Sequence, residues 1–171
     1  MIVADASPLI VLAKLRRLEL LHDLYGAVLI GPVVKAEAID AGRLAGARDV
    51  DQLEGALADG RLRVVKPTTP AEGHRQRLMT RSRIHPGEAE SIALARARGL
   101  RLVVDDREAR NAAAIEGVDH VGTVGAMLEA YRQRHMDLGE LETTVRDLSQ
   151  ILWLSPVVVA EVLRLAREAE R

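Results

Sequence analysis

The residues of this chain whose types and spacing suit chemistry are acids at the ends of short apolar runs. Asp5 follows residues 2–4, and Asp105 and Asp106 follow residues 102–104. Each run has the length and apolar character of a buried strand. Ligands of parallel sheets bind beyond the carboxyl ends of the strands, so we expect these acids to meet there.

Capping divides these acids into two groups. Ser7 stands before a proline and is expected to be the N-cap of the first helix, which leaves Asp5 free to face a ligand. Asp105 and Glu108 have the spacing of a capping box. We therefore assign the cap of the following helix to Asp105, and we expect Asp106 to face the site.

Glu37 lies within an expected helix, in a stripe with the periodicity of an inward face: Val34, Glu37, Ala38 and Ala41. An acid on such a face is costly unless a cation meets it. A lysine or arginine would serve, and a metal ion would serve equally well.

Glu88 and Glu90 lie in the first turn of a helix expected over residues 86–98, which Gly99 ends. The helix dipole by itself favours acids there. Residues two apart on a helix point about 200° from each other. The two acids are therefore not expected to reach one centre, and periodicity does not separate them.

Acids brought to one edge of a sheet repel one another unless some are protonated or a divalent cation compensates them. Carboxylate oxygens and water suit Mg²⁺ or Mn²⁺, and such ions activate water for attack on a phosphodiester. The chain has no cysteine, which excludes disulfides, thiol nucleophiles and thiolate metal sites.

The elements that must position these acids alternate along the 171 residues. Short strands are expected at 2–4, 27–30, 62–65, 102–104 and 118–121, with helices between them and a loop at 66–70. This order predicts an α/β fold whose sheet is covered on both faces. We expect one domain over residues 1–135, and a helical extension over 136–171 that packs on it through apolar faces.

Basic residues gather between His74 and His85, although the formal net charge of the chain is only −1. The stretch either contacts nucleic-acid phosphates or forms an exposed helix or loop. The candidate contacts are Arg75, Arg77, Arg81 and Arg83. Aromatic residues make up only 2% of the chain, which argues against base stacking as the main mode of binding.

Four motifs together resemble the PIN-domain family. They are DASPLI at residues 5–10, PVV at 32–34 followed by Glu37, GEAESIALA at 87–95 and LVVDDR at 102–107. The last two are similar to a subfamily related to VapC toxins. The resemblance covers roughly residues 1–125.

The resemblance implies a three-layer α/β/α sandwich with a mostly parallel sheet, and an endoribonuclease dependent on Mg²⁺ or Mn²⁺. It also implies a homodimer and inhibition by a small antitoxin protein. The ligands carried over from the motifs are Asp5, Glu37, Glu88 and Asp106, and Ser7 would hydrogen-bond within the site. Glu90 and Asp105 remain alternative ligands.

Two residues depart from the family pattern. Glu88 stands where the commoner toxin motif has Asp, and Val104 stands where threonine is usual. A PIN-like binding or regulatory subunit without catalysis is therefore the alternative reading. Whether the target is RNA or DNA stays open. Thr123, after the last strand, is expected to be an N-cap.

Other classes fit poorly. A haloacid-dehalogenase phosphatase needs a second Asp where Ser7 stands, and a receiver domain needs a late lysine, whereas the last lysine is Lys66. A dinucleotide-binding domain needs a glycine-rich first turn, which this chain lacks. With no targeting signal and no membrane span recognised, we expect a cytoplasmic protein.

Overall fold

A five-stranded parallel sheet forms the centre of the computed structural model, which describes residues 1–81 and 83–168. Its order is β3-β2-β1-β4-β5, and all four pairs of neighbouring strands are parallel. The strands are β1 (Ile2–Ala4), β2 (Val28–Ile30), β3 (Leu62–Val64), β4 (Leu102–Val103) and β5 (His120–Val121). The expected α/β fold is confirmed, and the sheet is parallel throughout.

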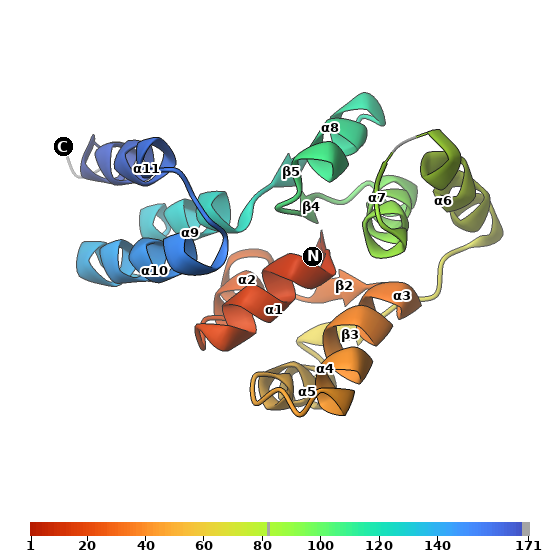
Figure 1. Cartoon of the computed structure of the whole chain (residues 1–171), viewed down its shortest axis with the longest axis horizontal. Coiled ribbons are helices and arrows are strands. Elements are labelled where there is room, and N and C mark those ends of the chain that lie inside the picture. Colours follow the sequence, from red (N-terminus) through yellow and green to blue (C-terminus); the bar gives the residue numbers. More distant parts are fainter. Residues whose placement is uncertain (82, 169–171) are drawn as a thin grey trace.

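Helices cover both faces of this sheet (Figure 1). One layer comprises α1 (Ala6–Lys14), α2 (Glu19–Tyr25), α5 (Val50–Ala58), α9 (Thr123–Arg132), α10 (Leu138–Ile151) and α11 (Pro156–Glu168). The other comprises α6 (Thr69–Arg81), α7 (Pro86–Arg98) and α8 (Arg107–Ile115). A continuous helical segment follows β2 and comprises α3 (Pro32–Lys35), the π-helix η1 (Ala36–Asp40) and α4 (Ala41–Leu44).

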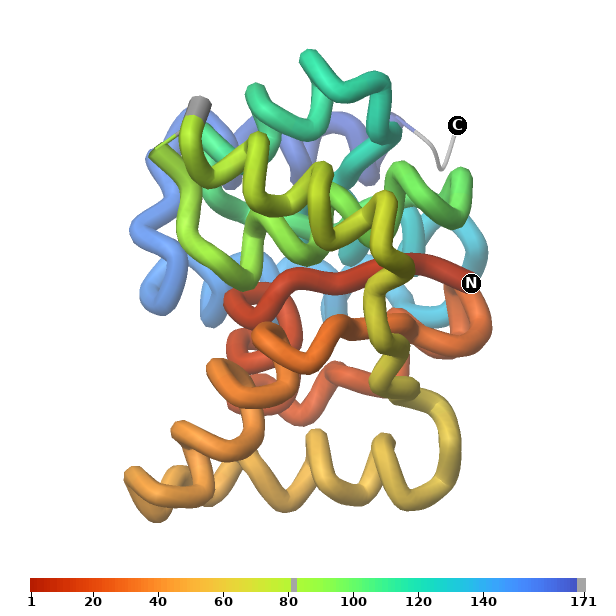
Figure 2. The backbone as a smooth tube through the Cα atoms, turned by 90° about the vertical axis from the view of Figure 1, so that its right-hand side faces the viewer, coloured from red at the N-terminus to blue at the C-terminus, as the bar shows by residue number. Residues whose placement is uncertain are grey.

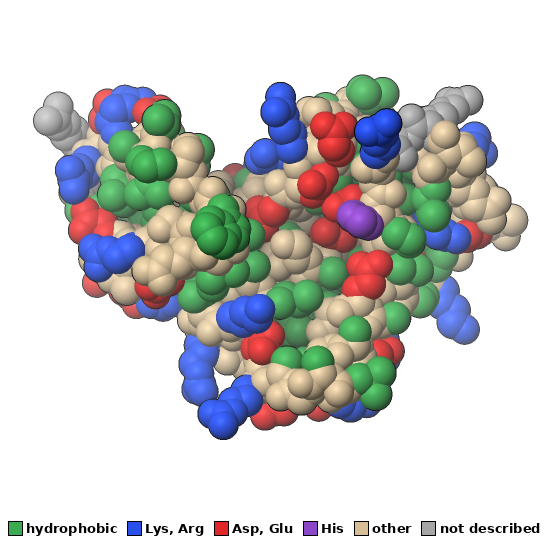
Figure 3. All heavy atoms as spheres, viewed as in Figure 1, with side chains coloured by type: hydrophobic (Ala, Val, Ile, Leu, Met, Phe, Trp, Pro, Cys, Tyr) green, Lys and Arg blue, Asp and Glu red, His purple; other side chains and the backbone are tan. Residues whose placement is uncertain are grey.

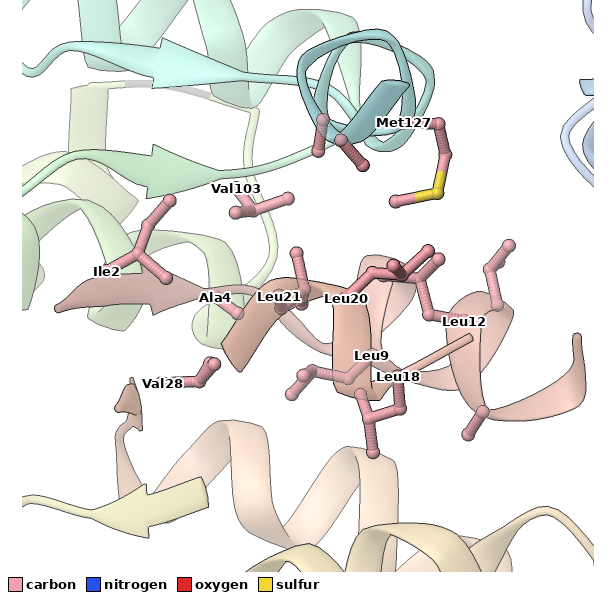
Figure 4. Close-up of a cluster of buried hydrophobic side chains, with 14 of the residues drawn as sticks. Ile2, Ala4, Leu9, Leu12, Leu18, Leu20, Leu21, Val28, Val103 and Met127 are labelled. Carbon is pink, nitrogen blue, oxygen red and sulfur yellow. The ribbon is translucent and has the colours of Figure 1, made fainter. Parts of the chain in front are cut away.

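The strand residues alternate between the two layers, as the pleat of a strand requires. Ile2 and Ala4 pack into the core beneath α1 and α2, while Val3 packs on the opposite side against α7 residues such as Ile92. Figure 4 shows the first of these cores, which aliphatic side chains fill together with Met127. A core on each face leaves no polar face for β1, β2 and β4, which explains their continuous apolar sequence, whereas the edge strands β3 and β5 also contain Arg63 and His120.

The register of β1 and β4 sets the position of the acids. Ala4 lies opposite Val103, and the amide of Asp5 donates to the carbonyl of Val103 at 3.0 Å. The two strands therefore end together, and Asp5 and Asp105 leave the sheet at the same edge. Figure 2 shows this first strand in the middle of the molecule, with α3–α5 on one side and α6–α8 on the other.

The C-terminal helices share the core of the α1 layer. Leu141 and Leu148 of α10 and Val162 of α11 are buried in it. This is the packing expected of an extension, while the boundary proposed after residue 135 stays a prediction. Among the described residues, no helix has both the length and the apolar character needed to cross a bilayer.

Two local expectations have different outcomes. Gly99 ends α7 in the left-handed conformation, with φ +61°, as predicted. The expected loop at residues 66–70 is wrong at its end, because α6 begins at Thr69. Pro70 lies in the first turn, where a missing N–H costs no helical hydrogen bond.

Candidate functional site

A cavity of about 510 Å³ lies at the carboxyl edge of the sheet. Three of the predicted acids line it: Asp5, Glu37 and Glu88. Its other walls come from α1, the residue before α7, and the end of α10, and include Lys14, His85, Ile151 and Leu152. Figure 3 shows acidic side chains gathered in the middle of one face, with a histidine beside them.

Asp5 occupies the N-cap position of α1, with an extended backbone at φ −81° and ψ 167°. The expected N-cap role of Ser7 is therefore wrong, because the helix already begins at Ala6. Ser7 is exposed and lines the cavity. Its predicted hydrogen bond within the site stays a prediction.

The residue Asp5 is only 5% exposed, and burial raises the pKa of its carboxyl to about 6. The amide of Ala6 opposes the rise in pKa, and the charges of Glu88 and Glu37 add to it. The buried hydroxyl of Ser91, on α7, donates to Asp5 Oδ1 over a long 3.4 Å. Asp5 thus sits in a site that disfavours its ionised form until a cation arrives.

Glu37 is exposed at the cavity, so its expected place on an inward stripe is wrong. The reason is the π-helix η1, whose wider turn rotates the following residues. Val34 and Ala38 of the expected stripe are buried as predicted, Ile39 is buried as well, and Ala41 turns to solvent. Glu37 escapes the cost of burial, and its carboxylate remains available to a ligand.

The approach of Glu37 to α7 depends on Gly87. A Cβ built on Gly87 would overlap the Glu37 carboxylate. A glycine here lets η1 and the start of α7 come close enough for both acids, Glu37 and Glu88, to face one cavity.

Glu88 and Glu90 are separated as the helix geometry predicts. Glu88 lines the cavity, and its Oε2 accepts the amide of His85 at 2.7 Å. Burial, together with the charges of Asp106 and Glu37, raises the pKa of Glu88 against the effect of that amide.

Glu90 instead accepts the amides of Val33 and Val34 at 2.9 and 3.1 Å. These amides belong to the N-terminal turn of α3, so Glu90 caps another helix. Gly31 makes the contact possible, since a Cβ on that residue would overlap the Glu90 carboxylate. Of the two acids, the geometry favours Glu88 as a ligand.

The assignment of the α8 cap to Asp105, with Asp106 free of capping, is wrong. Asp106 is the N-cap of α8 and accepts the amide of Ala109 at 2.8 Å through Oδ1. Asp105 accepts the amide and the hydroxyl of Thr123 at 2.7 and 2.6 Å, at the start of α9. Gly122 is the N-cap of α9 and Thr123 is its first residue, so the N-cap role expected of Thr123 is wrong, and Thr123 instead donates to Asp105.

Asp106 does not line the cavity formed by the other three acids, although its charge acts on Glu88. Because Asp106 is exposed and its cap uses only Oδ1, Oδ2 is available to an ion or to water. Its role as the fourth ligand stays a prediction.

Among the described side chains, which do not include that of Arg81, no Lys or Arg forms an ion pair with a carboxylate of the predicted set Asp5, Glu37, Glu88 and Asp106. Within the same described part, no group of three or more acids or histidines is already arranged to hold a metal. Carboxylates that lack cationic partners and share a wet cavity fit Mg²⁺ or Mn²⁺, since Mg²⁺ uses one or two carboxylates and keeps several waters.

The predicted phosphate contacts differ from one another. Arg75 is partly buried and makes an ion pair with Glu72 at 2.6 Å, whereas Arg77 and Arg83 are exposed. The side chain of Arg81 lies outside the described residues. Arg75, Arg77 and Arg83 do not line the acidic cavity, and the contact of all four arginines with nucleic acid stays a prediction.

Several residues of this site, the following four among them, were not identified from the sequence. Lys14 and His85 line the cavity, Ser91 contacts Asp5, and Leu152 closes one wall. The GEAESIALA motif contains Ser91, and a polar residue between apolar neighbours of a helix was its available signal. No sequence pattern placed the end of α10 at the cavity.

Comparisons with known proteins give one match. A sequence model of a protein family, described as DUF3368: PIN domain, matches residues 1–168. No curated protein and no solved structure matches the chain. The matched range includes both C-terminal helices.

Proposed function

Because the chain belongs to the PIN-domain family, which has a nuclease-type fold, we propose that it is a ribonuclease dependent on Mg²⁺ or Mn²⁺. One observation carries the proposal: Asp5, Glu37 and Glu88 share a single cavity without a cationic partner among the described residues. Asp106, next to this group, is proposed as the fourth ligand.

The chain positions each acid before any ion binds. Asp5 is fixed by its place at the end of β1, and Glu88 is oriented by the amide of His85. Glu37 is exposed and adjusts its side chain at little cost. When bound, the divalent ion supplies an activated water and stabilises the leaving oxygen of the phosphodiester.

Of the described residues that line this cavity, Lys14 is the one with a permanently cationic side chain. It lies on α1, one wall of the cavity, and it is exposed. We propose that it contacts a phosphate of the bound strand, which partly offsets the repulsion between the acids and the nucleic acid. Its ammonium would act as a mobile point charge on the phosphate.

The finer identity of the substrate and the partners rests on the four resembling motifs. We propose RNA as the substrate, a homodimer as the assembly, and a small antitoxin protein as the inhibitor. A cleavage assay with matched RNA and DNA strands distinguishes the substrates. Light scattering of the purified chain tests the homodimer, and a monomer at all concentrations would contradict it.

A PIN-like binding subunit without catalysis is the second candidate. It is favoured by the lack of a preformed group of three ligands among the described residues, and by Asp106, which already caps α8. Such a protein would bind nucleic acid without cutting it, whether or not a divalent ion is present.

The deciding experiment measures Mn²⁺ binding by calorimetry and RNA cleavage for the native chain and for Asp5→Asn. The native chain should bind Mn²⁺, and chelator and Asp5→Asn should each lower cleavage at least a hundredfold while circular dichroism shows an intact fold. Asp51→Asn is the matched control, because Asp51 is an exposed acid of α5 away from the cavity. Cleavage that persists in chelator would contradict the proposal.

A further inference from the structure

Trp153 lies next to the acidic cavity, in the turn between α10 and α11. It directly follows Ile151 and Leu152, and both of these residues line that cavity. Figure 1 shows the same turn beside α1, whose residues Ile10 and Lys14 form the facing wall. The chain has no other tryptophan.

The stability of the folded chain does not account for a tryptophan at position 153. Trp153 is 90% exposed, so it buries almost none of its apolar surface in the folded chain. Its backbone has φ +52°, in the left-handed region that favours glycine and asparagine. A large aromatic residue in this conformation strains the turn and gains no burial there. Such a combination points to a ligand outside the chain.

The neighbourhood indicates which ligand. An exposed indole offers a π-face on which any nucleobase can stack. The adjoining cavity of about 510 Å³ contains Lys14 for a phosphate and the acids for a divalent ion. A base on Trp153 with its phosphate beside Lys14 brings the next phosphodiester toward the acids.

We propose that Trp153 is a stacking platform for one unpaired base of a single-stranded nucleic acid whose backbone enters the acidic cavity. A base inside a duplex is already stacked on its neighbours and is not available to the indole. The contact does not depend on the base sequence of the nucleic acid, because every base has a π-face. It deepens the proposed ribonuclease function, on which it rests, by assigning a strand preference to the site.

The low aromatic content of the chain is compatible with a single stacking contact. An aromatic content of 2% excludes a continuous stacking surface, but one aromatic residue directly after two residues that line the cavity is sufficient to orient one base. Backbone contacts still supply the rest of the affinity. Trp153 is therefore a positioning residue and takes no part in the bond-breaking step.

The experiment uses the full chain in chelator, so that binding is separated from cleavage. The fluorescence of the single tryptophan is followed during titration with a single-stranded RNA and with the duplex of the same sequence. We expect saturable quenching by the single strand and little change with the duplex. A labelled RNA measures the affinity of variants by anisotropy.

The variants separate stacking from apolar contact. Trp153→Leu keeps an apolar side chain without the large π-face, and it should weaken single-strand binding about tenfold. Trp153→Phe should retain most of the affinity. Ile115→Ala is the matched control, since Ile115 is an exposed apolar residue at the end of α8, 84% exposed, and does not line the cavity. Thermal melting checks that each variant folds.

The outcomes separate this inference from the proposed function. The stacking platform alone is overturned if the chain cleaves RNA while the fluorescence of Trp153 does not change on RNA binding. It is also overturned if the Trp153→Leu variant binds RNA like the native chain. Quenching without cleavage supports the platform and contradicts the ribonuclease. An emission maximum that shifts to the blue with protein concentration alone overturns the platform, because a second copy of the chain then covers the indole.

Discussion

Asp105 accepts both the amide and the hydroxyl of Thr123, at 2.7 and 2.6 Å, and this pair joins the end of β4 to the start of α9. Thr123 is fully buried, so its hydroxyl depends on this one carboxylate. The pair fixes the chain direction after β4. It also occupies both oxygens of Asp105, while the charge of Asp106 acts on Glu88.

Loss of the Asp105 contact should destabilise the fold. Asp105→Ala leaves the buried hydroxyl and amide of Thr123 unsatisfied, which we expect to cost about 1–3 kcal/mol in urea unfolding. Thr123→Val in the same background should add much less than it does alone, because the two residues form one interaction. Additive effects of the two substitutions would show that they act separately. Mn²⁺ affinity of the folded variant should stay within a few-fold of native.

Glu88 and Glu90 should respond differently to substitution. Glu90→Ala removes the acceptor of the Val33 and Val34 amides, and it should cost about 1–3 kcal/mol of stability with little change in Mn²⁺ affinity. Glu88→Gln keeps an oxygen for the His85 amide, so its stability should change by less than about 1 kcal/mol. Calorimetry should show at least a tenfold loss of Mn²⁺ affinity for Glu88→Gln. The reverse pattern would make Glu90 the ligand.

Gly87→Ala tests the close approach of Glu37 to α7. The added Cβ meets the far end of a flexible, exposed side chain, so Glu37 must move away while the fold changes little. We expect Mn²⁺ affinity and cleavage to fall several-fold at nearly native melting temperature. Gly55→Ala is the control, because a Cβ there meets nothing within 4 Å. It should raise stability by about 0.5–1 kcal/mol and leave the metal affinity unchanged. Equal effects of both substitutions on Mn²⁺ affinity would exclude the proposed contact.

The pKa of Asp5 should make the stability of the metal-free protein depend on pH. Its folded pKa of about 6 lies above the ordinary value of 3.8, so the folded state holds the proton more tightly. The tighter proton binding of the folded state contributes its full stabilisation below about pH 3.8. This contribution is lost as the pH rises through about 6. The difference amounts to about 3 kcal/mol.

Asp5→Asn provides the measurement for this prediction, since asparagine is neutral at every pH. In chelator, urea unfolding should show the variant to be about as stable as the native chain near pH 4, and more stable by up to about 3 kcal/mol at pH 8. Adding Mn²⁺ at pH 8 should reverse the order, because only the native carboxylate binds the ion. A stability difference that does not change with pH would contradict the burial of an ionisable Asp5.

Sequence by itself determined the order of the elements and the edge at which the acids lie. Short apolar runs that alternate with helical segments predict a parallel sheet covered by helices on both faces. The bounds expected for α7, residues 86–98, agree with the structure because proline begins the helix and glycine ends it. These signals are local, so they need no knowledge of distant parts of the chain.

Tertiary structure alone decided which acids face the cavity. Glu90 turns away because its hydrogen-bond partners, Val33 and Val34, lie more than fifty residues earlier, and Asp105 turns away because Thr123 lies eighteen residues later. The exposure of Glu37 depends on a π-turn that helical periodicity does not contain. A carboxylate takes whichever donor the fold brings to it, and that choice is made in space, between residues whose separation along the chain carries no pattern.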